Sequence, residues 1–307
     1  MGRRREKGRP VNGILLLDKA IGISSNKALQ EVKHLFNARK AGHTGSLDPL
    51  ASGLLPICLG EATKLSSFLL DSDKRYEGIC KLGAVTTTAD AEGEVIESKP
   101  VPALSRAEVE AVLQRYTGDL EQIPPMHSAI KQNGQPLYKL ARQGVEVERQ
   151  PRQIHIYELR LREQRPDELD IFVKCSKGTY IRTLAEDIGR DLGCGAHLGQ
   201  LRRTGVGPFN IENAYTLAQL SEILQQGGQA ALDALLLPLE AALGDFPDIH
   251  LTDNGTFYVQ QGQPVQVAQA PTEGLVRLYS QDERFLGVGQ ILDDGRVAPK
   301  RLLKATS

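Results

Sequence analysis

The 307-residue sequence predicts an α+β protein, in which a mixed, largely antiparallel sheet with flanking helices is followed by a small β-barrel. Apolar runs of strand length alternate with polar turns through most of the chain. Amphipathic stretches with helical spacing lie between these runs. After residue 247 only short strand-like runs remain, separated by Gly, Pro and Asp. The length suits one or two domains.

The N-terminal third contains the most unusual stretch of the chain. NGILLLDK predicts a buried strand, and SSN marks the start of a helix. Residues 41–64, AGHTGSLDPLASGLLPICLGEATK, are interpreted as a loop rich in Gly and Pro, closed by a short helix over 61–70. YEGICKLG predicts a strand, and Ser105 with Glu108 forms a capping box that opens a helix.

Residues 121–152 have a weak periodic pattern and three prolines between positions 124 and 136. Between 124 and 152 the segment has two acidic residues and five basic ones: Lys131, Lys139, Arg142, Arg149 and Arg152. One interpretation is a long surface excursion, and the other is a mobile clamp over a substrate, since long irregular segments are often functional.

The second half resumes regular patterns. IHIYELRL and LDIFVKCS predict strands, YIRTLAEDIGRDLG an amphipathic helix and HLGQLRRTGVG another strand. Helices are expected after the capping residue Thr216 and around 230–242. The chain then reaches a boundary near Pro247, and FYVQ, PVQV, LVRLYS and FLGVGQIL are expected as strands of the small all-β module.

Composition narrows the class of protein. The chain is 40% hydrophobic and 24% charged, as globular proteins are. No apolar run reaches the roughly 20 residues of a membrane helix, and no apolar segment follows the charged N-terminus as in a signal peptide, so we expect a cytoplasmic protein. Its four cysteines form no CxxC pair, which predicts neither a disulfide framework nor a metal site.

Charge is distributed unevenly. Residues 1–75 carry 13 Lys and Arg against 7 Asp and Glu, whereas residues 76–307 carry 24 against 31. This asymmetry permits a basic face for a polyanion such as RNA. A solvated basic tail over residues 1–10 explains the N-terminal arginines equally well.

The cofactor motifs that a sequence can reveal are missing. The sequence contains no P-loop, no dinucleotide-binding glycine pattern in a strand-to-helix context, no G-x-S-x-G elbow and no HExxH. We therefore expect no metal and no cofactor. What remains is one conspicuous acid, Asp48, inside the glycine-rich stretch.

Asp48 has the chemistry of a nucleophile. An aspartate is ionised at neutral pH and can attack an electrophilic carbon to form an ester. Gly45 and Gly53 permit tight backbone geometry around it, and Pro49 disfavours a helical conformation at Asp48. The alternative is a purely structural turn or N-cap, because Asp-Pro is a common turn element.

The motif GHTGSLDPLASGLLP resembles the catalytic motif of the TruB family of tRNA pseudouridine synthases. The resemblance covers nearly the whole chain, because further blocks stand in the family's order: NGILLLDK, ISSN, DSDKRYEG, IPPMHSAIKQNGQPLYKLARQG, CSKGTYIRTLAEDIG and GCGAHLGQLRRT. It implies a catalytic domain over residues 11–247 with the clamp at about 121–152, and a PUA-like RNA-binding domain over 248–307.

The resemblance also implies a reaction. Uridine 55 in the T loop of tRNA is isomerised to pseudouridine without a cofactor, after the base has been flipped out of the loop. Asp48 is the implied nucleophile, and its attack on C6 of the base or on C1′ of the sugar stays open. The implied partner is tRNA, bound through its T-arm and acceptor stem by a monomeric enzyme.

Five substrate-binding residues follow from the family's motifs. Tyr76 stacks on the uracil and is a candidate to take the C5 proton, Tyr180 contacts the same nucleotide, and Arg182 pairs with Asp48. His43 fills space in the T loop and stacks on a base. Leu201 lines the pocket. Read without the family, Tyr76 and Leu201 are typical of strand cores, Tyr180 of helix-start packing, His43 of a loop and Arg182 of a surface.

Two other functions stay open at this point. An RNA-binding or RNA-folding protein of the same shape needs the basic surfaces but not Asp48. A cofactor-free glycosidase or nucleosidase uses Asp48 as its nucleophile and needs a second carboxylate as acid and base, for which Asp90 and Glu92 are candidates. Product analysis separates these classes, since a hydrolase releases free base and an isomerase forms pseudouridine.

Overall fold

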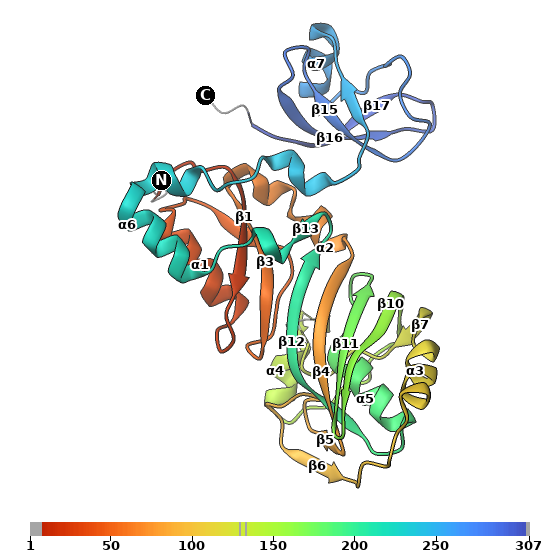
Figure 1. Ribbon diagram of the computed structural model, residues 1–307. Coiled ribbons are helices and arrows are strands. Elements are labelled where there is room, and N and C mark those ends of the chain that lie inside the picture. The colour runs from red at the N-terminus through yellow and green to blue at the C-terminus, as the bar shows by residue number, and fades with distance from the viewer. Residues whose placement is uncertain (1–7, 129, 133, 305–307) are drawn as a thin grey trace.

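The computed structural model describes residues 8–128, 130–132 and 134–304. A long twisted sheet runs through the larger part of the molecule, and a smaller unit stands at one end (Figure 1). Residues 1–7 of the basic tail expected over residues 1–10 lie outside the described residues. Arg9 is described, and it is anchored by an ion pair with Asp233 instead of being free in solvent.

Nine strands form the large sheet: β1 (Gly13–Lys19), β2 (Ala41–His43), β3 (Ala51–Leu59), β4 (Lys74–Leu82), β7 (Gly118–Gln122), β10 (Arg152–Arg165), β11 (Glu168–Cys175), β12 (Ala196–Val206) and β13 (Phe209–Asn210). Their order is β1-β3-β12-β4-β11-β10-β7, with β2 paired to β3 and β13 to β12. The pair β12–β3 is parallel, and the other pairs described in this sheet are antiparallel. The predicted mixed, largely antiparallel sheet with flanking helices is confirmed.

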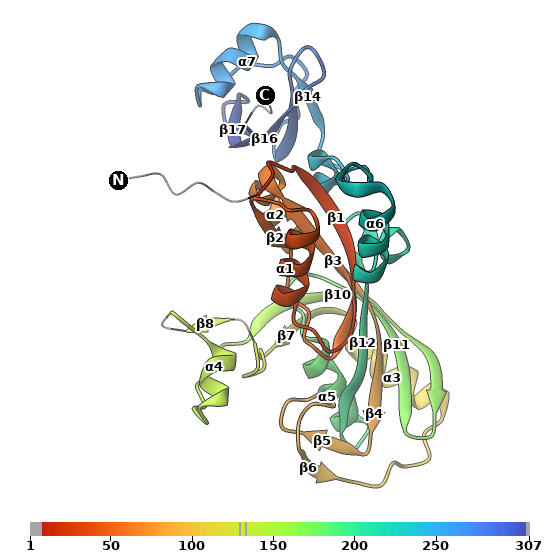
Figure 2. The ribbon, with the colours of Figure 1, turned by 90° about the vertical axis from the view of Figure 1, so that its left-hand side faces the viewer.

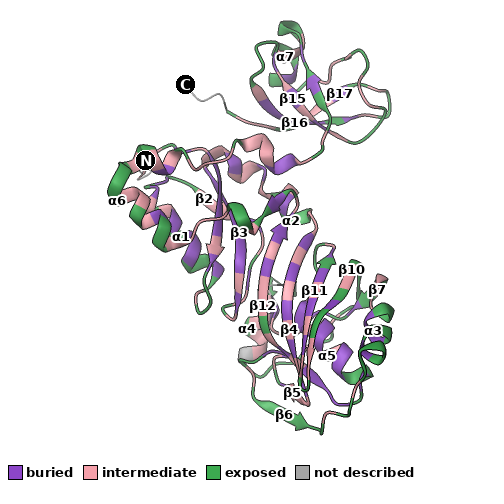
Figure 3. Cartoon of the chain, in the orientation of Figure 1, coloured by how far each residue is buried: buried purple, intermediate pink, exposed green. Residues whose placement is uncertain are grey.

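The α-helices of the larger part are α1 (Ser25–Leu35), α2 (Ser66–Asp71), α3 (Arg106–Arg115), α4 (Leu137–Arg142), α5 (Ile181–Asp191) and α6 (Leu217–Asp233). Apolar residues of α1 and α6 pack with β1 and β3, whereas α3 and α5 pack with the far end of the sheet. Figure 2 shows α1 and α6 beside β1. Buried and half-exposed residues alternate strictly along β4, as expected where a single face is packed (Figure 3).

Helix starts follow the predicted caps. The capping box of Ser105 and Glu108 opens α3, and Thr216 caps α6 through a second capping box with Gln219. The prediction of a helix around 230–242 is wrong. Helix α6 is interrupted at Gly228 and ends at residue 233, and only the 3₁₀ helix η3 (Leu239–Leu243) follows.

The stretch 41–64 is not one loop. Strands β2 and β3 occupy most of it, and only residues 44–50 between them are irregular. The short helix expected over 61–70 is divided into the 3₁₀ helix η1 (Gly60–Lys64) and α2. A further 3₁₀ helix, η2 (Ile211–Asn213), follows β13. The irregular loop leads into the first residues of β3, 51–53, which pair with β12.

The expected clamp is partly regular. It contains β8 (Lys131–Gln132), β9 (Gln135–Pro136) and α4, which stand away from the sheet in Figure 2. The chain before it forms a separate hairpin of β5 (Ala84–Thr86) and β6 (Val95–Ser98). Whether the segment moves as a clamp stays a prediction.

The C-terminal unit is a four-stranded sheet with one helix: β14 (Asp248–His250), β15 (Leu275–Tyr279), β16 (Phe285–Ile291), β17 (Val297–Leu302) and α7 (Asp253–Gln260). The prediction of a strand at FYVQ is wrong, because these residues lie in α7. Thr252 caps this helix by accepting a hydrogen bond from the Gly255 amide. PVQV contributes only a single bridge, from Val265 to Val297. A closed PUA-like barrel and the domain limits stay predictions.

Candidate active site

Asp48 lies in the loop 44–50, which links β2 to β3. The Ser25 hydroxyl holds this loop from helix α1, since it accepts from the Leu47 amide at 2.7 Å and donates to the Leu47 carbonyl at 2.9 Å. The Asp48 carbonyl accepts from the Ala51 amide at 3.0 Å, with Pro49 at the second position of that turn. The backbone of Asp48 is therefore part of a turn, as one interpretation of the sequence held. The turn uses only backbone groups of Asp48, so its carboxylate is available for other contacts.

Arg182 pairs with Asp48, as expected from the sequence. Its Nη2 lies 3.1 Å from Oδ2 of Asp48. The Asp48 side chain is 45% exposed, whereas the Arg182 side chain is only 7% exposed. The pair thus presents its carboxylate to solvent and its cation to the protein. A guanidinium in this position orients the carboxylate and stabilises its charge.

Three further groups hold Arg182. Its Nη1 lies 3.4 Å from Oδ2 of Asp90 and donates to the Thr88 carbonyl at 3.3 Å, while Nη2 donates to the His127 carbonyl at 2.7 Å. Asp90 is only 3% exposed and also accepts from the Thr88 hydroxyl and the Glu92 amide. Asp90, a candidate second carboxylate by sequence, is therefore committed to holding the arginine.

Tyr76 lies on β4 in the main core, together with Leu47 and Ala51 at the two ends of the Asp48 turn. The interpretation of Tyr76 as a core aromatic is therefore also correct. Burial raises the pKa of the Tyr76 phenol, the positive charge of Arg203 opposes this shift, and Asp48 adds to it. The ring is thus in the same electrostatic environment as Asp48.

Tyr180 immediately precedes α5, where the side-chain amide of Gln122 brackets its backbone. Gln122 accepts from the Tyr180 amide at 2.7 Å and donates to the Tyr180 carbonyl at 3.0 Å. Burial raises the pKa of the half-buried Tyr180 phenol, and the Asp48 charge adds to that shift. Tyr76 and Tyr180 therefore reach the Asp48 environment from two different elements.

His43 ends β2, opposite Ile57 of β3. Its ring is half-buried, and among the described residues Nδ1 is buried without a hydrogen-bond partner. Burial lowers the pKa of His43, and the charge of Arg203 lowers it further. Both effects favour the neutral imidazole, which can stack on a base without being charged.

Leu201 is half-buried on β12, where it lies opposite Ala51 of β3 and Gly78 of β4. Its side chain packs on the main core. The parallel pair β12–β3 therefore brings Leu201 to the strand that begins just after Asp48. Leu201 therefore packs in the core, as its strand pattern predicted. A role in lining the pocket is compatible with this position.

Two buried cations near Asp48 were missed by the sequence reasoning. Lys19, at the end of β1, is fully buried and donates to the carbonyls of Ala20 and Ile23 at 2.9 and 2.8 Å. Burial lowers the pKa of Lys19 to about 8, although Asp48 acts in the opposite direction. Arg203, on β12, is 2% exposed. Lys19 ends its predicted strand and Arg203 follows another arginine inside its strand, so neither position carried a local signal of burial.

The assembled site contains one half-exposed carboxylate with buried cations behind it and two tyrosines beside it. The arrangement suits nucleophilic attack by a carboxylate on a bound group, with the cations stabilising negative charge. No helix in the described part of the chain is both long and apolar enough to span a bilayer.

Solved structures share this fold. An H/ACA ribonucleoprotein bound to a substrate RNA containing 2′-deoxyuridine has a TM-score of 0.74 at 22% identity, with 99% of this chain and 92% of that chain covered. A Cbf5–Nop10–Gar1 complex has a TM-score of 0.72 at 24% identity, over 100% of this chain and 90% of that chain. These two structures show that the chain shares its fold with RNA-associated complexes.

The chain belongs to the TruB family of pseudouridylate synthases. The model for the N-terminal domain of this family matches residues 33–181. The models for the tRNA pseudouridylate synthase B C-terminal domain and the pseudouridine synthase II TruB C-terminal region match residues 182–244 and 247–303.

Two relatives are similar over their full length. The tRNA pseudouridine synthase B of Nitrosococcus oceani is 58% identical over 305 residues, which cover 99% of both chains. The protein of the same name from Stutzerimonas stutzeri is 52% identical, over 99% of this chain and 100% of the relative.

Proposed function

We propose that this enzyme converts uridine 55 in the T loop of tRNA to pseudouridine, with Asp48 as the nucleophile. The observation that carries the proposal is the Asp48–Arg182 pair, in which a half-exposed carboxylate is held by a buried guanidinium. The full-length relatives named tRNA pseudouridine synthase B support tRNA as the substrate.

The target base must leave the T loop before it meets Asp48. Flipping a nucleotide costs a few kcal/mol, which contacts in the pocket must offset. Tyr76 stacks on the uracil, Tyr180 contacts the same nucleotide, and Leu201 lines the pocket. His43 occupies the space that the base vacates, and its lowered pKa keeps the ring neutral there.

The isomerisation exchanges one glycosidic bond for another. The bond between N1 and C1′ breaks, the uracil rotates, and a bond forms between C5 and C1′. The C5 proton leaves, N1 gains a proton, and Asp48 is regenerated as a carboxylate. Asp48 forms a transient bond with either C1′ or C6, and Tyr76 is the proposed acceptor of the C5 proton.

A glycosidase reading is less compatible with the geometry. Such an enzyme needs a second carboxylate that reaches the substrate as acid and base. Asp90, one of the two candidates, is 3% exposed and bonded to the same guanidinium as Asp48. Glu92, the other candidate, is exposed, and its charge acts on Lys19 as that of Asp48 does. Product analysis therefore decides whether Glu92 serves as an acid and base.

The tRNA is held at two distant places in this proposal. The clamp, residues 121–152, meets backbone phosphates of the T-arm through its basic side chains, and the PUA-like domain from residue 248 holds the acceptor stem. We expect a monomer that acts in the cytoplasm.

Mapping the product tests the proposal. The purified protein is incubated with an unmodified tRNA transcript and with a matched transcript that carries cytidine at position 55. The expected result is pseudouridine at position 55 of the first transcript and at no site in the second. Tight binding without modification would contradict the proposal and favour an RNA-folding protein, and free uracil would indicate a hydrolase.

A further inference from the structure

Arg203 is a buried cation without an anionic partner in the described part of the chain. Its side chain is among the largest that are fully buried. Nε donates to the Leu54 carbonyl at 2.8 Å, and Nη1 and Nη2 donate to the Ser46 and Gly45 carbonyls at 3.5 and 3.3 Å. Burying a charge costs several kcal/mol, and backbone carbonyls recover only part of that cost.

The three carbonyls lie on both sides of Asp48. Gly45 and Ser46 precede Asp48 in the loop, and Leu54 follows it in β3. A single rigid guanidinium therefore joins the chain before the Asp48 turn to the chain after it. The Ser25 hydroxyl holds the next residue, Leu47, so the loop is fixed at three successive residues, 45–47.

The backbone is shaped to admit Arg203. Gly53 has a φ of 102°, and a Cβ there would lie 2.3 Å from the Arg203 carbonyl oxygen. Strand β3 pairs with β12 only over residues 51–53 and with β2 only over 57–59. The Leu54 carbonyl lies in the gap between these partners, which leaves it free to accept from the guanidinium.

Arg203 also faces Tyr76, because the two residues are direct cross-strand partners in the β12–β4 pair. The groups that act on the Tyr76 phenol are Arg203, Cys175 and Asp48, and Arg203 is the positive one. The same side chain thus touches the loop of the nucleophile and lies against the aromatic residue proposed to receive the C5 proton.

We propose that Arg203 is a positioning residue for the isomerisation, which holds the Asp48 loop and Tyr76 in one arrangement and places a positive charge beside the phenol. The inference rests on the proposed function of Asp48 and Tyr76. It assigns two separable contributions to Arg203: the bonds to three carbonyls and the charge.

Two variants separate these contributions. Arg203→Lys keeps the charge but lacks the planar fork, so single-turnover pseudouridine formation falls about 100-fold, as for a reacting group displaced by about 1 Å. Arg203→Met loses the charge as well. Without a positive charge beside it, the Tyr76 phenol loses its proton less readily. The rising limb of the pH–rate profile therefore moves to higher pH in Arg203→Met. In Arg203→Lys, which keeps the charge, the limb stays in place.

The control is Arg202→Met on the same strand, because Arg202 faces away and pairs with Asp18 at 2.7 Å. Its rate and pH profile stay as in wild type. The dissociation constant for tRNA stays within about threefold in Arg203→Lys and Arg203→Met, since the proposal places no RNA contact on Arg203.

A folded Arg203→Lys enzyme that works at the wild-type rate would overturn the proposal, and so would a lower rate in Arg203→Met with an unmoved pH profile. If Arg203→Met does not fold, Arg203→Lys alone decides. Wild-type protein that forms no pseudouridine at all would instead refute the proposed function, so the two failures are distinguishable.

Discussion

Arg182 connects three parts of the chain through one guanidinium. It bonds Asp48 of the loop, Asp90 behind it and the His127 carbonyl of the clamp segment. The bond to His127 means that the start of the clamp and the proposed nucleophile share a partner. Any displacement of the clamp at this point alters the environment of Asp48.

Replacing Asp90 with asparagine tests how far Arg182 depends on its buried partner. Asp90→Asn leaves a buried cation with one carboxylate fewer, and we expect the free energy of unfolding to fall by about 3 kcal/mol. Turnover falls by about 100-fold because Arg182 no longer orients Asp48. Chemical denaturation and single-turnover assays measure the two effects, with the exposed Glu94→Gln as the control. Normal turnover in Asp90→Asn would contradict this role.

His43 predicts a pH dependence of stability. The ordinary pKa of histidine, 6.5, applies to the unfolded chain, and burial lowers the pKa in the folded state. The unfolded state therefore binds more protons below about pH 6.5, and stability is lost as pH falls from there toward the lower folded pKa. Denaturation across this range should show a shallower loss in His43→Gln than in wild type or in the exposed control His34→Gln. Equal slopes would contradict the assignment.

At the scale of elements, the adjacent residues Ser24 and Ser25 provide a matched pair. The Ser24 hydroxyl caps α1 by accepting from the Lys27 amide, whereas the Ser25 hydroxyl holds Leu47 beside Asp48. Ser24→Ala should cost about 1 kcal/mol of stability and leave turnover unchanged. Ser25→Ala should cost about 1–3 kcal/mol and also lower the single-turnover rate. Equal turnover in the two variants would show that the Asp48 loop does not need the hydrogen bonds of Ser25.

The sequence predicted the strands β1, β4, β10, β11, β12, β15 and β16 and the helices α1, α3, α5 and α6, because their hydrophobic periods and caps are local signals. Strand β3 was missed because Gly53 and Pro56 are typical of loops. The register explains both residues, since Gly53 admits the close approach of β12. Pro56 lies in the gap between the partners β12 and β2. No strand there would accept a hydrogen bond from its backbone nitrogen, so the missing N–H costs nothing.

The candidate site was predictable only where a motif reached it. Asp48 and Arg182 stand in motifs of the family, and their pairing was expected. The burial of Lys19 and Arg203 depends on which strands lie side by side, and no local pattern encodes that. Strand β17 was missed for a local reason, because Pro299 weakens the strand pattern and is tolerated in a strand at the end of the sheet order.

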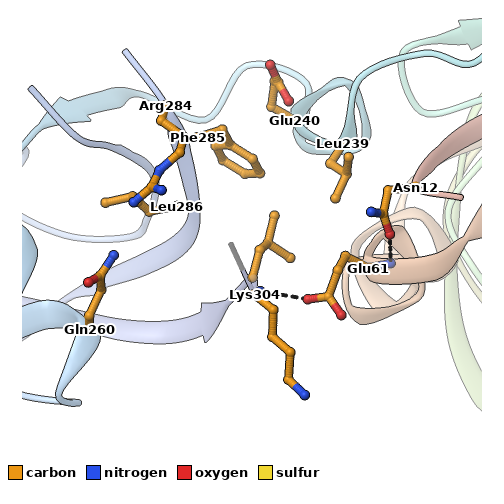
Figure 4. A pocket seen from close by; sticks show the side chains of 10 residues that line it. Asn12, Glu61, Leu239, Glu240, Gln260, Arg284, Phe285, Leu286 and Lys304 are labelled. Carbon is orange, nitrogen blue, oxygen red and sulfur yellow. Dashed lines mark hydrogen bonds between the residues drawn. The ribbon is translucent and has the colours of Figure 1, made fainter. Parts of the chain in front are cut away.

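At the scale of the whole molecule, η1 contacts the C-terminal unit at residues 302–304. The Lys304 amide donates to Glu61 at 2.7 Å, and Lys64 pairs with Glu61 at 2.6 Å and donates to the Leu302 carbonyl at 3.2 Å. A cavity of about 220 Å³ opens beside these contacts, between Leu239 on one side and Phe285 on the other (Figure 4). The junction sets the distance between Asp48 and the C-terminal unit.

Loosening the junction should affect binding and not chemistry. Glu61→Ala removes the acceptor of Lys304, and we expect the dissociation constant for tRNA to rise about fivefold, equivalent to about 1 kcal/mol. The single-turnover rate at saturating tRNA stays at the wild-type value, because Glu61 touches no group of the site. Glu110→Ala on α3, which breaks a surface pair with Arg106, is the control. A slower saturated rate in Glu61→Ala would contradict two-point binding.

The most direct measurement for the central claim compares wild type with Asp48→Asn on an unmodified tRNA transcript. Asparagine keeps the size of the side chain and removes the negative charge that attacks carbon. We predict that Asp48→Asn binds tRNA within about threefold of wild type and forms no pseudouridine. Pseudouridine at position 55 at the wild-type rate in this variant would contradict the account and leave Asp48 as a turn residue.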